Sequence, residues 1–152
     1  SWNAAADEPS DKKIRGAWDE CLKWMQREVD LCKREHKACV LLVSPVKFQF
    51  FDDTRVYSQK VLKEFAARNT IAYVDLLVDL RENARKEIIA AHALDPETGF
   101  DALTVSYSQE LDDYWRRYFL DHDHYTAQGH AFVAGILLPI VADMIDMREN
   151  NG

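Results

Sequence analysis

The sequence lacks any apolar run long enough to cross a lipid bilayer, which takes about 20 residues. Its longest such run, Ala131–Ala142, is only about a dozen residues long and contains Gly135 and Pro139. We therefore expect no membrane span.

Basic residues are scarce compared with acidic ones. The chain has 19 Lys and Arg against 26 Asp and Glu, which gives a net charge of -7. The basic residues are scattered among acids and form no stripe. Because nucleic acids bind to positively charged surfaces, we expect no nucleic-acid partner.

Cysteine is rare as well. Cys21, Cys32 and Cys39 are odd in number and spaced like core positions. They provide neither the framework of a disulfide-stabilised secreted domain nor a Cys-x-x-Cys metal motif. No signal peptide is visible, and the chain starts at Ser1 without Met, so the compartment stays open.

What the chain does contain is enough apolar material for a folded core. Its 152 residues are 47% hydrophobic, which is typical of a globular protein and not of a disordered one. The length suits one domain and is short for two. We expect a single domain over residues 1–152, or a segment of one.

Helices are predicted from the spacing of apolar residues. Between Ile14 and Cys32 these residues recur every three or four positions, which indicates an amphipathic helix of roughly two dozen residues. Pro139 should kink or interrupt the last helix. The other expected helices cover residues 56–68, 77–93, 108–118 and 126–147.

Two strands are predicted between the helices, Ala38–Val43 and Ile71–Val74. A continuous apolar strand is typical of a parallel sheet covered on both faces. Alternation of strands with helices predicts βαβ crossovers. Two strands are few for an independent α/β sheet. We therefore expect half of a larger doubly wound domain, or a domain that another chain completes.

The densest chemical feature is the segment Asp121–His130. It holds three of the five histidines and two aspartates, directly before the apolar part of the last predicted helix. Histidine titrates near neutral pH, which suits general acid–base chemistry. A group of proton carriers and potential ligands at the mouth of a core helix indicates a chemical site.

This segment resembles the last loop of the SGNH/GDSL hydrolases, a superfamily of esterases, lipases and carbohydrate acetylesterases. The family pattern Asp-x-x-His corresponds to Asp121 and His124, and it is followed here by Thr126 and by Gly129-His130. The resemblance implies that His124 is the general base and Asp121 its orienting carboxylate. A serine hydroxyl needs such a pair, because it is a poor nucleophile until an imidazole takes its proton.

The upstream order is also similar to that family: a long helix, a strand ending in Ser44-Pro45, a helix, and a strand ending in Val74-Asp75. The resemblance implies a three-layer α/β/α fold with a parallel, flavodoxin-like sheet, of which this chain carries the C-terminal part. It also implies that the chemistry needs no cofactor.

The sequence departs from the other two motifs of the family. The Gly-Asp-Ser motif of the nucleophile does not occur in these 152 residues, and neither does the following oxyanion-hole glycine. Ser1-Trp2-Asn3-Ala4 takes the place of the family's Gly-x-Asn-Asp, so Asn3 would be the oxyanion-hole residue. The implied activity is hydrolysis or acyl transfer on an ester such as an O-acetylated glycan or lipid. An N-terminal segment or a second chain would supply the serine.

A metal site is an alternative use of the same residues. On an extended segment His122 and His124 would point the same way. Together with Asp121 and His130 they would suit zinc or iron. No second cluster of ligands accompanies them in the sequence, so we expect no metal.

Other residues can be interpreted as part of a functional site or as having a structural role alone. Ser44 and Asp75 end strands, where α/β folds place active-site groups, but a polar strand end is the simpler role. Phe48, Phe50 and Phe51 would either line an acyl or sugar pocket or cap the core. The alternative function is a non-catalytic α/β binding or assembly module with an aromatic-lined cleft, and the missing nucleophile supports it directly.

Overall fold

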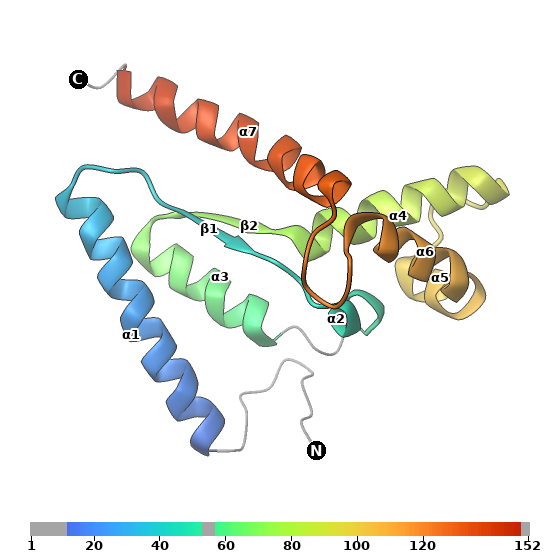
Figure 1. Ribbon diagram of the computed structural model, residues 1–152, viewed down its shortest axis with the longest axis horizontal. Helices are drawn as coiled ribbons and strands as arrows, with labels where there is room; N and C mark the ends of the chain where they lie inside the picture. Colours follow the sequence, from blue (N-terminus) through green and yellow to red (C-terminus); the bar gives the residue numbers. More distant parts are fainter. Residues whose placement is uncertain (1–11, 53–56, 150–152) are drawn as a thin grey trace. The chain divides into compact units, whose positions relative to one another are not determined.

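The computed structural model describes residues 12–52 and 57–149 (Figure 1). The chain divides into two compact units, Ser1–Leu77 and Val78–Gly152. It is mostly helical, 73%, with two short parallel strands in the described residues. The two units are described in turn.

The first unit begins with α1, Lys12–Arg34, a helix of 23 residues that confirms the predicted amphipathic helix. Its last turn carries Lys33 and Arg34, which the negative end of the helix dipole favours. Beyond the helix, His36 adopts a left-handed backbone conformation, with φ of 52°. That residue turns the chain away from α1 and toward the first strand.

The two strands are β1, Val40–Val43, and β2, Ala72–Asp75. They pair in parallel, as predicted, with Val40 opposite Ala72 and Val43 opposite Asp75. The connection between them contains α2, Lys47–Phe51, and α3, Tyr57–Asn69. The buried apolar side chains of this unit come from α1, both strands, α2, α3 and the two residues that follow β2: Val29, Val43, Phe50, Phe65, Ala66, Val74, Leu76 and Leu77.

The expected three-layer α/β/α fold is wrong. Each strand has four residues, and the sheet in the described residues has two strands, while most of the remaining chain is helical. Three of the four β1 residues are only half-buried, so the strand is not covered on both faces as its apolar run predicted. The run was apolar enough for a central strand, but the described residues provide one partner strand and leave three of its four residues half-buried.

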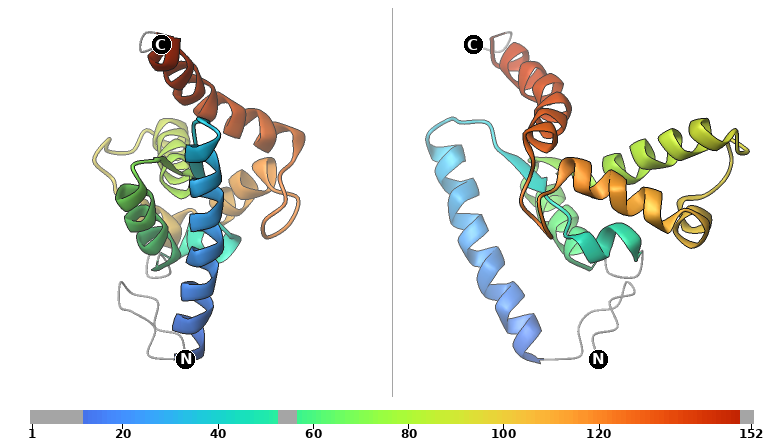
Figure 2. Two further views of the ribbon diagram at one scale, coloured as in Figure 1. Left: turned by 90° about the vertical axis from the view of Figure 1, so that its left-hand side faces the viewer. Right: turned by 45° about the vertical axis from the view of Figure 1, so that its right-hand side comes forward.

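The second unit contains most of α4, Leu76–His92, followed by α5, Phe100–Ser106, and α6, Ser108–Tyr118. The last helix is α7, Ala127–Glu149. α6 lies beside α4, where the Asn83 amide donates to the Tyr114 hydroxyl at 2.9 Å (Figure 2). The most deeply buried apolar side chains of this unit are Leu80, Ala84, Leu103, Leu111, Trp115 and Phe119.

The last helix is long, apolar and largely exposed. It continues through Pro139, which therefore does not end it. Leu138 and Ile145 are 70% and 52% exposed. By length and composition alone, Ala127–Asp146 would suffice to cross a membrane, with 20 residues and a mean hydropathy of 1.5. Counting uninterrupted apolar residues overlooked this stretch, because it is diluted by a few polar residues.

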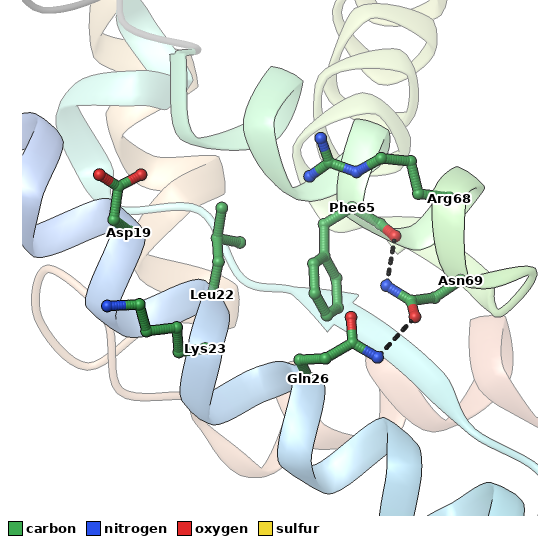
Figure 3. Close-up of a pocket in the computed structure, with 7 residues that line it drawn as sticks. All are labelled: Asp19, Leu22, Lys23, Gln26, Phe65, Arg68 and Asn69. Atoms are coloured by element: carbon green, nitrogen blue, oxygen red, sulfur yellow. Dashed lines mark hydrogen bonds between the residues drawn. The ribbon is translucent and has the colours of Figure 1, made fainter.

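A groove of about 520 Å³ lies between α1 and α3 in the first unit (Figure 3). A short polar relay joins the two helices at its edge. The Gln26 amide donates to Asn69 Oδ1 at 2.9 Å, and the Asn69 amide donates to the Phe65 carbonyl at 3.1 Å. The groove is lined by Asp19, Leu22, Lys23, Gln26, Phe65, Arg68 and Asn69.

Candidate functional site

The site lies on the loop that joins α6 to α7, drawn in orange in Figure 2. An antiparallel bridge between Phe119 and Tyr125 closes this loop at its base. Inside the bridge the Leu120 amide donates to the His124 carbonyl at 2.7 Å. The five residues between the bridge partners therefore form a short, closed hairpin on which the acids and histidines sit.

Two buried aromatic rings anchor the hairpin. Trp115 and Phe119 are each 1% exposed and stack with ring centroids 3.8 Å apart and an interplanar angle of 6°. The Trp115 indole Nε1–H also donates to the Asp121 carbonyl at 2.9 Å. Tyr125 packs on the Phe119 ring at 4.7 Å from the other end of the loop. The backbone of Asp121 is thus tied to the buried part of α6.

Thr126 and Gly129 fix the start of α7. The Thr126 hydroxyl accepts a hydrogen bond from the Gly129 amide at 3.0 Å, as an N-cap residue does, and donates to the Arg117 carbonyl at 2.7 Å. A Cβ on Gly129 would collide with the Tyr118 backbone carbonyl oxygen. Only glycine allows this approach of helix to loop. These two residues of the motif therefore have structural roles that hold the loop.

Asp121 holds the loop and the histidine at the same time. Its Oδ1 accepts hydrogen bonds from the backbone amides of Asp123, at 3.1 Å, and His124, at 2.9 Å. Its Oδ2 lies 2.8 Å from Nδ1 of the His124 ring. An ionised carboxylate only accepts hydrogen bonds, so Nδ1 carries a proton and donates it to Asp121. The unprotonated nitrogen of the neutral ring is then Nε2.

Hydrogen bonds, and after them the charges within the turn, shift the pKa values of both Asp121 and His124. The Asp123 and His124 amides, followed by the His124 ring, hold the pKa of Asp121 well below its ordinary value. The hydrogen bond to Asp121 and the negative charges of Asp121 and Asp123 raise the pKa of His124. The His124 side chain is 73% exposed, so solvent screens these interactions. In the described part of the chain Nε2 has no hydrogen-bond partner, and it is open to a reactant.

Asp123 is a second carboxylate beside the same ring nitrogen. Its Oδ1 lies 3.1 Å from His124 Nδ1, and one donor atom from each of Asp121, Asp123 and His124 lies within 4.8 Å of the other two. Two carboxylates with one imidazole form a mixed oxygen and nitrogen set, which suits zinc or iron better than calcium or magnesium, whose ligands are oxygens. A cation there would use Nδ1 and would compete with the Asp121–His124 hydrogen bond. The set differs from the alternative weighed from the sequence, because it lacks His122 and His130.

Neither of these two histidines is brought into the pair. His122 is exposed on the hairpin. His130 lies in the first turn of α7, where its amide donates to the Thr126 carbonyl at 2.9 Å and its ring lies 5.5 Å from the Tyr125 ring. The alternation that would have pointed His122 and His124 the same way fails, because Asp121 folds the backbone into a turn.

The remaining residues considered from the sequence do not belong to this loop. Asn3 lies outside the described residues. Ser44 is exposed after β1. Asp75 starts α4: its Oδ1 accepts the Leu77 amide at 3.1 Å, and its Oδ2 accepts the Tyr73 hydroxyl at 3.3 Å. These bonds give Asp75 the plain structural role of a turn carboxylate.

The aromatic residues after β1 divide between the core and the surface. Phe50 is fully buried, whereas Phe48 is 47% exposed. Phe51 packs edge-on against Phe50, with centroids 5.2 Å apart. Phe50 therefore caps the core, and the other two flank it.

Sequence reasoning missed two contributors to the site, Trp115 and Asp123. Trp115 is six residues before Asp121, in the helix expected over residues 108–118. Its indole N–H, which a buried tryptophan must pair, was the available signal for a contact with the following loop.

No protein family matches the chain, and neither does any curated protein or solved structure.

Proposed function

We propose that this chain carries the acid–base pair of a serine ester hydrolase or acyl transferase of the SGNH type. The observation that carries the proposal is the 2.8 Å contact between Asp121 Oδ2 and His124 Nδ1, with Nε2 directed to no described partner. This is the arrangement that a serine triad needs on its basic side. The proposal depends on this local geometry and the sequence motif, and not on the overall fold.

In this mechanism His124 Nε2 takes the proton of a serine hydroxyl while the serine oxygen attacks the ester carbonyl. Collapse of the tetrahedral intermediate breaks the bond to the alcohol, which leaves with the proton from Nε2. Water then hydrolyses the acyl-serine by the same proton transfers, or an acceptor alcohol takes the acyl group. Asp121 holds the ring and stabilises the imidazolium.

The serine comes from an N-terminal segment or a second chain, because the sequence has no Gly-Asp-Ser motif. Asn3 would donate a hydrogen bond to the oxyanion. An ester such as an O-acetylated glycan or lipid is the substrate class, and the reaction needs no cofactor.

The test treats the native preparation with a fluorophosphonate serine probe and reads the intact mass of every polypeptide present. We expect the label on a longer or second chain. In the complete protein His124→Ala should lower the labelling rate and the esterase rate by roughly 10²–10⁴-fold, the usual contribution of a general base. His122→Ala is the matched control on the same exposed hairpin. Equal rates for the two variants would refute the role of His124.

The second candidate is a non-catalytic binding or assembly module. It is favoured by one observation, the exposed apolar side chains Leu138, Val141 and Ile145 on α7. Contiguous exposed apolar surface marks a site of association. No label on any chain, with the probe active on a control esterase, would favour this candidate. A label on this chain itself would make Ser44 the first residue to replace.

A further inference from the structure

Two cysteines that are seven positions apart in sequence meet at the junction of α1 and β1. Cys32 lies in the last turns of α1, and Cys39 directly precedes β1. Their Sγ atoms are 2.8 Å apart, and both thiols are free and half-buried. The sequence alone showed no disulfide framework, because the cysteine count is odd and the spacing resembles core positions.

The backbone, and not chance side-chain orientation, brings the two thiols together. The Lys37 amide donates to the Cys32 carbonyl at 2.7 Å, and the His36 amide donates to the Lys33 carbonyl at 3.1 Å. With His36 in the left-handed region, these two bonds form a Schellman motif. The motif reverses the chain within three residues, so that Cys39 returns over the turn that carries Cys32.

We propose that Cys32 and Cys39 form a redox-active dithiol, which a low-molecular-weight disulfide such as oxidised glutathione converts into an intramolecular disulfide. An S–S bond is about 2.05 Å long, so the two sulfurs need to approach by less than about 1 Å. The small displacement distinguishes this pair from cysteines that must refold to react.

The reaction is two successive thiol–disulfide exchanges. One protein thiolate attacks a sulfur of oxidised glutathione, breaks its S–S bond and releases one reduced glutathione. The second protein thiolate attacks the mixed disulfide at the protein sulfur and releases the second glutathione. Two protons leave the protein thiols, and the two electrons reduce the one glutathione disulfide to two thiols.

The environment of the two sulfurs determines which of them attacks glutathione disulfide first. Burial, followed by the hydrogen bond to Cys32 and the charges of Cys32 and Glu28, raises the pKa of Cys39 to about 11. Cys39 therefore keeps its proton and donates it to Cys32 Sγ. Cys32 attacks first and Cys39 resolves the mixed disulfide. Accordingly, Cys39→Ser should accumulate a glutathione adduct on Cys32, whereas Cys32→Ser should react more slowly with glutathione disulfide.

The first experiment incubates the 152-residue chain with oxidised glutathione, blocks the remaining thiols with N-ethylmaleimide and measures the intact mass. We expect one maleimide, on Cys21, and a loss of two hydrogens. Trypsin should then release peptide 28–33 joined to peptide 38–47, because the chain has cleavage sites at 27, 33, 37 and 47. Three maleimides, or a bond that includes Cys21, would overturn the proposal.

The second experiment repeats the titration in concentrated urea, with Cys21→Ser as the parent protein to exclude other pairings. If the fold positions the sulfurs, half-oxidation of the native chain should need a ratio of oxidised to reduced glutathione at least ~10-fold lower than that of the unfolded chain. Equal midpoints would show that mere closeness in sequence drives the reaction, and the assignment of a folded dithiol would be wrong.

Discussion

Replacing Gly129 by alanine tests the structure of the loop. Helix propensity and the structure predict changes of opposite sign in the free energy of unfolding. Both Gly129 and Gly135 lie in α7. Alanine is favoured over glycine inside a helix by up to about 1 kcal/mol. Propensity alone therefore predicts that both Gly129→Ala and Gly135→Ala stabilise the protein.

The structure separates the two positions. A Cβ at Gly135 meets nothing within 4 Å, so Gly135→Ala should raise the free energy of unfolding by about 1 kcal/mol. At Gly129 the Cβ would collide with the Tyr118 carbonyl oxygen and lie 3.0 Å from Tyr125 Cδ1. A backbone carbonyl cannot rotate away as a side chain can. Overpacking costs about 1–3 kcal/mol, and a collision with a rigid backbone carbonyl belongs in the upper part of that range, so Gly129→Ala should be destabilising by about 1–2 kcal/mol net of propensity.

Urea denaturation of the parent and the two variants, followed by far-ultraviolet circular dichroism, measures these changes. The midpoints should move in opposite directions, with the two variants about 2–3 kcal/mol apart at an unchanged slope. A gain for Gly129→Ala equal to that for Gly135→Ala would refute the close approach of α7 to Tyr118. The hairpin would then leave α6 at a different place, because this approach fixes its position.

Three further predictions test the site and the helix ends. Thr126→Ala should lower the free energy of unfolding by about 1 kcal/mol, because the Gly129 amide loses its acceptor. Thr126→Ser keeps a hydroxyl acceptor and should keep the stability of the parent, and urea denaturation compares the two variants. Asp121→Asn should lower the pKa of His124 toward its ordinary value, since the amide keeps an acceptor for the turn but loses the charge; an unchanged NMR titration would contradict the pairing. Ala93→Gly should stabilise by about 0.5–1 kcal/mol in thermal unfolding, because the φ of Ala93 is 51°.

Most of the long elements could be predicted from the sequence because their apolar periodicity is sustained. α1 and α6 lie where the spacing placed them, and α6 matches the predicted bounds of Ser108–Tyr118. The short helices α2 and α5 were missed, since five and seven residues are too few to show a helical period. α2 begins in part because Gln49 Oε1 accepts the Val46 amide at 3.1 Å, a local bond that periodicity does not report.

The layers of the fold could not be predicted in the same way. An apolar run such as Ala38–Val43 indicates a strand that would be stable with other strands beside it and helices on both faces. It does not show that the chain contains those strands and helices. The structure pairs this run with β2 and leaves Val40, Leu41 and Leu42 half-buried. Sheet formation depends on contacts distant in sequence, which local patterns do not encode.

The candidate site was predicted in part. The side chains of Asp121 and His124 meet, as the resemblance implied, and their catalytic role stays a prediction. The role of Asp123 beside Nδ1 was missed, because an extended segment would have placed it on the opposite side from His124. The turn that Asp121 makes with the two following amides brings all three side chains together.

Asp121 shapes the hairpin and pairs with His124, and these two interactions are present over different pH ranges. Its lowered pKa means that its bonds stabilise the fold above its ordinary value of 3.8 and are lost as the pH falls through the lowered value. The raised pKa of His124 adds stability that is full below its ordinary value of 6.5 and is lost as the pH rises through the raised value. The ion pair is therefore fullest between these limits, where His124 is protonated and cannot act as a base.

Base catalysis requires a pH above the raised pKa of His124, at which the ion pair has weakened to a hydrogen bond. The bonds from the Asp123 and His124 amides to Asp121 depend only on the ionisation of Asp121, which is complete throughout that range. The hairpin thus keeps its shape when the histidine loses its charge. Because the same carboxylate shapes the loop and orients the ring, His124 Nε2 stays in place in both protonation states, as the proposed proton transfers require.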